Sequence, residues 1–134
     1  MTYEGMPLLA VQKGINASIA ADIFVPIPCG DKRIVPRYVW FTNASASLAL
    51  TTTAVGIYTG AGATGTAIVT ASTANLTPLV ASTDLVDTVF SPVAAIALSA
   101  AVDGSHGSGL YINIGGTPTV NATFDVYIGG HVLT

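Results

Sequence analysis

The chain has 134 residues, the size of one domain, and 51% of them are hydrophobic while only 8% are charged. A typical soluble domain has about 25% charged residues, so much of this surface must consist of Ser, Thr, Ala, Gly and Asn. The small net charge of −3 and the high apolar fraction disfavour a disordered chain. A neutral surface suits a protein that is packed against others, and we therefore expect a homo-oligomer.

Positive charge is confined to the beginning of the chain. All four cations, Lys13, Lys32, Arg33 and Arg37, precede Tyr38. Binding to nucleic acid requires clustered Lys and Arg, so we expect no nucleic-acid partner. No apolar run reaches the ~20 residues of a membrane-spanning helix. The first residues also lack the basic start and apolar core of a signal peptide. We therefore expect neither a membrane partner nor secretion.

The strand signals follow one another in chain order after an irregular start. Residues 1–18 show no alternation, so we expect an N-terminal arm there and a single domain over residues 19–134. The expected strands cover residues 22–27, 37–43, 47–57 as one or two strands, 66–70, 94–99, 110–114 and finally 124–128, after which a Gly-Gly pair is expected to bend the chain. Pro26 confines its strand to a sheet edge or a bulge. Pro78 stops any long element in residues 71–87, which we expect to hold one short strand or a single helical turn.

This pattern predicts the fold class. Short runs rich in Val, Ile, Thr and aromatic residues, separated by turn residues, are typical of an all-β protein. About eight such strands in one antiparallel domain most often form a β-sandwich of the jelly-roll kind. The prediction is thus an antiparallel, jelly-roll-like β-sandwich with an N-terminal arm.

Two strands show the period of two that separates a buried face from an outer face. In residues 37–43, Val39 and Phe41 alternate with Tyr38 and Trp40. The predicted core residues are Phe41, Phe124, Val126 and Ile128, because each has apolar partners two residues away. Trp and Tyr are enriched at subunit contacts, so Tyr38 and Trp40 are candidate interface aromatics. The alternative is that they form a sugar-binding platform together with Tyr58 or Tyr127.

One glycine-rich segment resembles a cofactor motif. Residues 60–65, GAGATG, match the G-x-G-x-x-G fingerprint of dinucleotide-binding proteins, and Asp84 lies near the expected spacing. That chemistry needs a helix directly after the glycines to hold the pyrophosphate. Here a β-branched run follows, so a hairpin loop is the better interpretation and we expect no cofactor.

Catalytic and metal-binding residues are scarce. The chain has two histidines, His106 in a Gly/Ser-rich loop and His131 near the last strand, and one cysteine, Cys29. No nucleophile-elbow motif is present, and these three residues do not make a metal-ligand set. We expect no enzyme and no metal, and the lone Cys29 fits assembly in a reducing cytoplasm.

Several segments together resemble the small virion proteins of tailed phages, of the capsid decoration or cement type. They are FVPIPCG at 24–30, YVWFTNAS at 38–45, VGIYT at 55–59, LYINI at 110–114 and FDVYIGGHVL at 124–133. The likeness lies in the residue character of these strand segments and in their order along the chain. It implies a β-sandwich protomer, commonly a homotrimer, that is made in the host cytoplasm, sits on the capsid exterior and stabilises the lattice. It provides no catalytic residue to carry over.

The resemblance also implies the major capsid protein as a partner. Candidate capsid-contact residues are Lys13, Lys32, Arg33 and Arg37, which would be attracted to an acidic capsid surface. The alternative function is a carbohydrate-binding β-sandwich of a phage head fibre or tail adhesin, because similar small sandwiches occur there.

Overall fold

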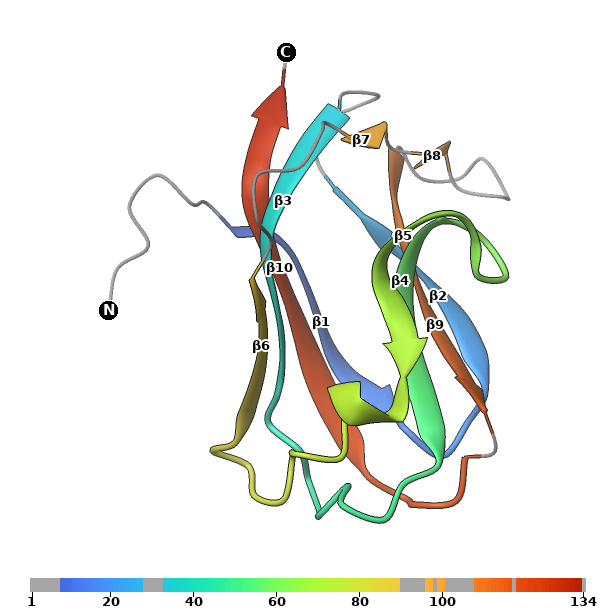
Figure 1. The fold of residues 1–134 in the computed structure, drawn as a ribbon, viewed down its shortest axis with the longest axis vertical. Helices are drawn as coiled ribbons and strands as arrows, with labels where there is room; N and C mark the ends of the chain where they lie inside the picture. Colours follow the sequence, from blue (N-terminus) through green and yellow to red (C-terminus); the bar gives the residue numbers. More distant parts are fainter. Residues whose placement is uncertain are drawn as a thin grey trace.

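The computed structural model describes residues 8–27, 33–89, 96–97, 99–100, 108–116 and 118–133. These residues form two antiparallel sheets packed face to face (Figure 1). The strands are β1 (Leu8–Asn16), β2 (Ala21–Pro26), β3 (Arg33–Thr42), β4 (Thr53–Gly60), β5 (Thr64–Ser72), β6 (Leu85–Val89), β7 (Ile96–Ala97), β8 (Ser99–Ala100), β9 (Ser108–Gly116) and β10 (Thr123–Leu133). The 3-10 turn η1 (Thr73–Asn75) lies between β5 and β6.

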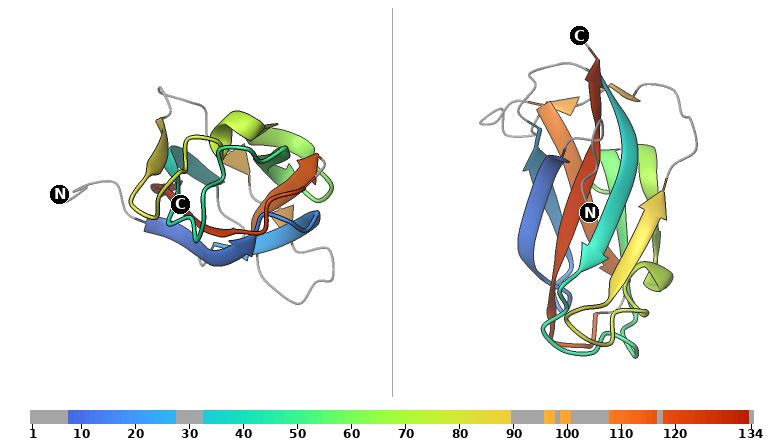
Figure 2. Two further views of the ribbon diagram at one scale, coloured as in Figure 1. Left: turned by 90° about the horizontal axis from the view of Figure 1, so that it is seen from below. Right: turned by 90° about the vertical axis from the view of Figure 1, so that its left-hand side faces the viewer.

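The strand order is that of a jelly roll. The first sheet runs β1-β10-β3-β6 and the second runs β2-β9-β4-β5, while the short strands β7 and β8 pair with β3 and β9. Most successive long strands lie in opposite sheets, which is how an eight-stranded jelly roll is wound. The right panel of Figure 2 looks onto the outer face of the first sheet. The predicted all-β, jelly-roll-like sandwich is confirmed.

The core lies between the two inner sheet faces. Phe41 of β3 and Phe124 of β10 are fully buried, with ring centroids 6.4 Å apart. Val126 and Ile128 follow on the same face of β10 and are equally buried, as the alternation predicts. Opposite them the second sheet contributes Val25, Val55, Ile57, Leu110, Ile112 and Ile114. Burial of these side chains, at about 25 cal/mol per Å² of apolar area, stabilises the sandwich.

The arm expected over residues 1–18 is wrong from Leu8 onward. Residues Leu8–Asn16 form β1, an edge strand of the first sheet that pairs with β10. The register shifts twice along this pairing, and Gly14 has a φ of +66°. Each β-bulge moves the following side chains to the other face. The alternation is therefore hidden in the sequence although the strand is present, and residues 8–18 belong to the sandwich domain. Residues 1–7 lie outside the described ranges.

The glycine-rich segment forms a hairpin, as predicted. The strands β4 and β5 enclose the turn 61–63, where Gly62 and Ala63 have positive φ. The connection 73–84 contains η1 and leads into the short strand β6. The strand expected from residue 47 begins only at Thr53, because 43–52 form a loop. The proline-bearing strand β2 lies at a sheet edge, which confirms the expectation from Pro26.

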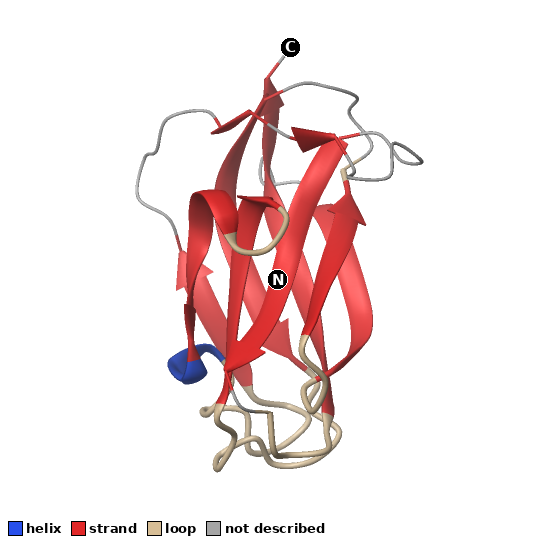
Figure 3. Ribbon diagram, turned by 90° about the vertical axis from the view of Figure 1, so that its right-hand side faces the viewer, coloured by secondary structure: helices blue, strands red, loops and turns tan. Residues whose placement is uncertain are grey.

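The long connections gather at one end of the sandwich. Residues 17–20, 43–52, 73–84 and 118–122 join strands at the lower end in Figure 1, and Figure 3 shows the loops there in tan. The strand β3 begins with Arg33 at the opposite end, where β10 finishes. The molecule thus presents sheet faces along its sides and a cluster of loops at its lower end.

Candidate interaction surface

The outer face of the first sheet carries a row of aromatic side chains. Trp40 of β3 lies between Tyr127 of β10 and Asp87 of β6 in the sheet register, and Tyr38 lies two residues before it. The ring centroids of Tyr38 and Trp40 are 4.7 Å apart, and those of Trp40 and Tyr127 are 6.4 Å apart. We call Tyr38, Trp40 and Tyr127 the aromatic row. Large rings on an outer sheet face are typical of surfaces that meet a partner.

Tyr38 lies in this row but is almost completely covered, with 6% of its surface exposed. Its partner in β10 is Gly129, which leaves room for the ring, since a Cβ at Gly129 would collide with ring atoms of Tyr38. The tyrosine therefore supports Trp40 from one side and offers little surface of its own. The alternation in the sequence predicted the correct face for Tyr38 but did not indicate that its ring is covered.

Trp40 is half-buried, and its indole N–H is already used. The Nε1 atom donates a hydrogen bond of 2.8 Å to Oδ1 of Asp87 on the neighbouring strand β6. This bond and the Tyr38 ring fix the orientation of the indole. Trp40 therefore presents a rigid apolar face, and a rigid aromatic side chain loses little conformational entropy when a partner covers it.

The three predicted basic residues that lie in the described ranges do not form one patch. Lys13 is exposed on β1. The register from β1 through β10 to β3 places Lys13 level with Phe41. Arg33 is exposed at the start of β3, eight residues before Phe41, which at ~3.3 Å per residue is roughly 26 Å away. Lys32 lies outside the described residues.

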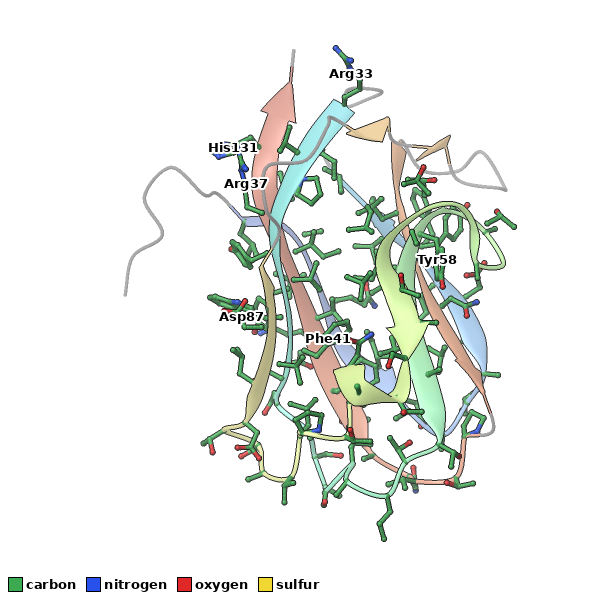
Figure 4. The ribbon with its side chains drawn as sticks, in the orientation of Figure 1. Arg33, Arg37, Phe41, Tyr58, Asp87 and His131 are labelled. Atoms are coloured by element: carbon green, nitrogen blue, oxygen red, sulfur yellow. The ribbon has the colours of Figure 1, made fainter. Side chains whose placement is uncertain are left out.

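The half-buried Arg37 belongs to the same end as Arg33. Figure 4 shows it beside His131, in agreement with the register that pairs β3 and β10 at Val35 and His131. Sequence reasoning treated His131 as an ordinary strand-end residue. The antiparallel pairing of two distant segments brings it next to Arg37, and no local sequence signal reports that neighbour.

Each aspartate in the described part of the chain accepts a hydrogen bond from a neutral N–H group. Asp87 accepts from Trp40, and Asp84 accepts from the backbone N–H groups of Val80 and Ala81. The carboxylate of Asp125 accepts from the Gly14 backbone at 2.9 Å and from the Asn43 side chain at 3.0 Å. These carboxylates hold loops and strands in place, which is a structural use.

The aromatic residues of the second sheet have a different setting. Gly62, at the tip of the β4–β5 hairpin, donates a 2.7 Å hydrogen bond to Asp22 of β2. Because β9 lies between β4 and β2, the hairpin tip crosses the outer side of β9 (Figure 3), where Tyr111 is buried. The Tyr58 hydroxyl accepts a hydrogen bond from the Ala71 backbone. Of the two further tyrosines considered for a sugar platform, Tyr127 joins the aromatic row and Tyr58 does not.

Comparisons with protein-family models, with curated proteins and with solved structures found no significant match to this chain. Among the described residues no group of three or more His, Cys, Asp or Glu side chains is arranged to hold a metal ion. No helix in the described ranges has the length and apolar character needed to cross a membrane. The fold and the surface described above are therefore the basis for a functional proposal.

Proposed function

We propose that this protein is a non-enzymatic virion structural protein that binds the outside of a phage capsid as a homo-oligomer and stabilises it. The observation that carries the proposal is the jelly-roll strand order, β1-β10-β3-β6 against β2-β9-β4-β5. Jelly rolls recur in viral capsid proteins and in lectins. A chain with only 8% charged residues further supports a protein that works packed against neighbours.

The aromatic row supports self-association through the outer face of the first sheet. Trp40 and Tyr127 are half-buried in the protomer, and Trp40 is held rigidly by Asp87. Trp and Tyr are the residue types that contribute most to subunit contacts. In a homotrimer each aromatic row meets a different surface of the next subunit, because a threefold contact is heterologous.

Co-sedimentation tests the capsid proposal. Heads of the phage that encodes this chain, purified without the protein, are mixed with it and pelleted, and the bound protein is quantified. Saturable binding and a higher temperature of head disruption are the expected results. A protein that stays in the supernatant at every concentration contradicts the proposal.

A carbohydrate-binding module is the second candidate, because Trp40 and Tyr127 lie together on an open sheet face. Sugars stack on exposed ring faces, however, and Tyr38 is covered, so it adds no ring face to such a platform. Titration of sugars against the fluorescence of Trp40, the one tryptophan, separates the candidates. Saturable quenching by a sugar supports the module, and an unchanged spectrum supports the structural protein.

A further inference from the structure

The loop end of the sandwich exposes large apolar side chains. We use the name loop end for residues 17–20, 43–52, 73–84 and 118–122. Ile19, Leu50 and Val80 are 57, 87 and 55% exposed there, and Leu85 adjoins them at the start of β6. In the described part of the chain only Leu8 is a comparably exposed large hydrophobic residue elsewhere. Exposed apolar side chains that are gathered in one place mark an interaction surface.

The loops that carry these side chains are bonded to one another. The Leu48 N–H donates to the Leu79 carbonyl at 2.8 Å, which joins the β3–β4 loop to the β5–β6 connection. The Ala17 N–H donates to the Ala122 carbonyl at 2.8 Å, which joins the β1–β2 loop to the β9–β10 loop. Leu48 and Leu79 are fully buried beneath the surface. The exposed side chains therefore stand on a preorganised base, which lowers the entropy lost on binding.

The loop end is also almost free of charge. Asp84 is its single charged residue, and the carboxylate accepts the backbone N–H groups of Val80 and Ala81 at 2.9 and 2.8 Å. The cations Arg33 and Arg37 lie toward the opposite end of the first sheet. A surface without free charge matches a partner surface that is itself apolar and neutral, since a charged partner group would lose its hydration there without compensation.

We propose that the loop end is the surface that seats this protein on the phage head, against a neutral, apolar area of the shell; this rests on the function proposed above. A second copy fits less well. In a cyclic oligomer whose subunits meet through their side faces, the equivalent ends of all subunits point to the same side and cannot cover one another. Several loop ends then engage the shell at once, which raises the overall affinity.

The test uses the full chain and undecorated heads. The variant with Leu50→Ser and Val80→Ser removes two exposed side chains, and Leu8→Ser is the matched control, since Leu8 is exposed on β1 away from the loop end. We expect at least tenfold weaker head binding for the double variant, about 1.4 kcal/mol. The control is expected to bind like wild type. Thermal unfolding and oligomer mass should match wild type in both variants, because the replaced side chains are exposed.

The outcomes separate this inference from the proposed function. If wild type binds heads and the double variant binds equally well, the loop end is not the contact although the function stands. If wild type itself does not bind, both are overturned. Binding that weakens steeply between about 50 and 500 mM salt assigns the contact to charged residues and contradicts a neutral surface. A changed oligomer mass in the double variant would assign the loop end to subunit contacts and overturn the inference.

Discussion

Tyr38 depends on a glycine in the adjacent strand. A Cβ at Gly129 would occupy the place of the Tyr38 ring, so Gly129→Ala must displace the ring from Trp40 or shift the strands. We expect a loss of about 1–3 kcal/mol of stability, as for other overpacked sites, together with a change in Trp40 fluorescence. Chemical denaturation and emission spectra measure the two effects.

A second glycine provides the control for this substitution. A Cβ at Gly115 would approach only the flexible side-chain oxygen of Asn113, at 3.3 Å, and the Ala54 carbonyl, at 3.9 Å. Gly115→Ala should therefore change stability by no more than about 0.5 kcal/mol. Equal stability of the two variants is incompatible with a Tyr38 ring that needs Gly129.

Phe124 is the second residue whose environment gives a quantitative expectation. Its ring is fully buried and lies 6.4 Å from that of Phe41, so truncation leaves a cavity between the sheets. Phe124→Ala should cost about 3–5 kcal/mol, measured by thermal or chemical unfolding. Leu50→Ala, at an 87% exposed position, is the comparison and should be nearly neutral. A melting temperature that barely moves would mean that this face of β10 does not form the core.

At the scale of elements, the presence of β1 determines how an N-terminal truncation should affect folding. Its pairing with β10 runs from Leu8 to Asn16, and Ile15 is buried in the core. Deleting residues 2–18 removes this strand, exposes the backbone edge of β10 and uncovers apolar surface. We expect a chain that aggregates or lacks near-UV circular dichroism. If the truncated chain melts cooperatively at the wild-type temperature, β1 is an arm and not part of the domain.

β-Bulges decided which strands could be predicted from the sequence. In β10 and the second half of β3 a regular alternation survives, so Phe41, Phe124 and the outward Trp40 were placed correctly. In β1 two register shifts conceal the period. The cover over Tyr38 requires Gly129, which becomes a neighbour only through the pairing of β3 with β10. Exposed Leu50 gave no signal either, because apolar residues in loops have no period and only tertiary structure decides their burial.

At the scale of the whole molecule, the aromatic row should determine the oligomer. Trp40→Ala removes the largest side chain of the row, and a tryptophan at the centre of an interface typically contributes 2 kcal/mol or more. We expect the dissociation constant between subunits to rise at least tenfold, measured by analytical ultracentrifugation or light scattering. Leu50→Ser, at the loop end, should leave the subunit equilibrium unchanged. A wild-type protein that is a monodisperse monomer at micromolar concentration contradicts self-association through this face.

We propose that this jelly roll decorates the outside of a phage head, and electron cryomicroscopy of heads incubated with the protein is the direct test. The expected result is added density on the outer surface at symmetry-related positions, into which the sandwich fits with its loop end toward the shell and its aromatic rows between subunits. Heads that gain no density, or only density in the interior, are incompatible with a decoration protein.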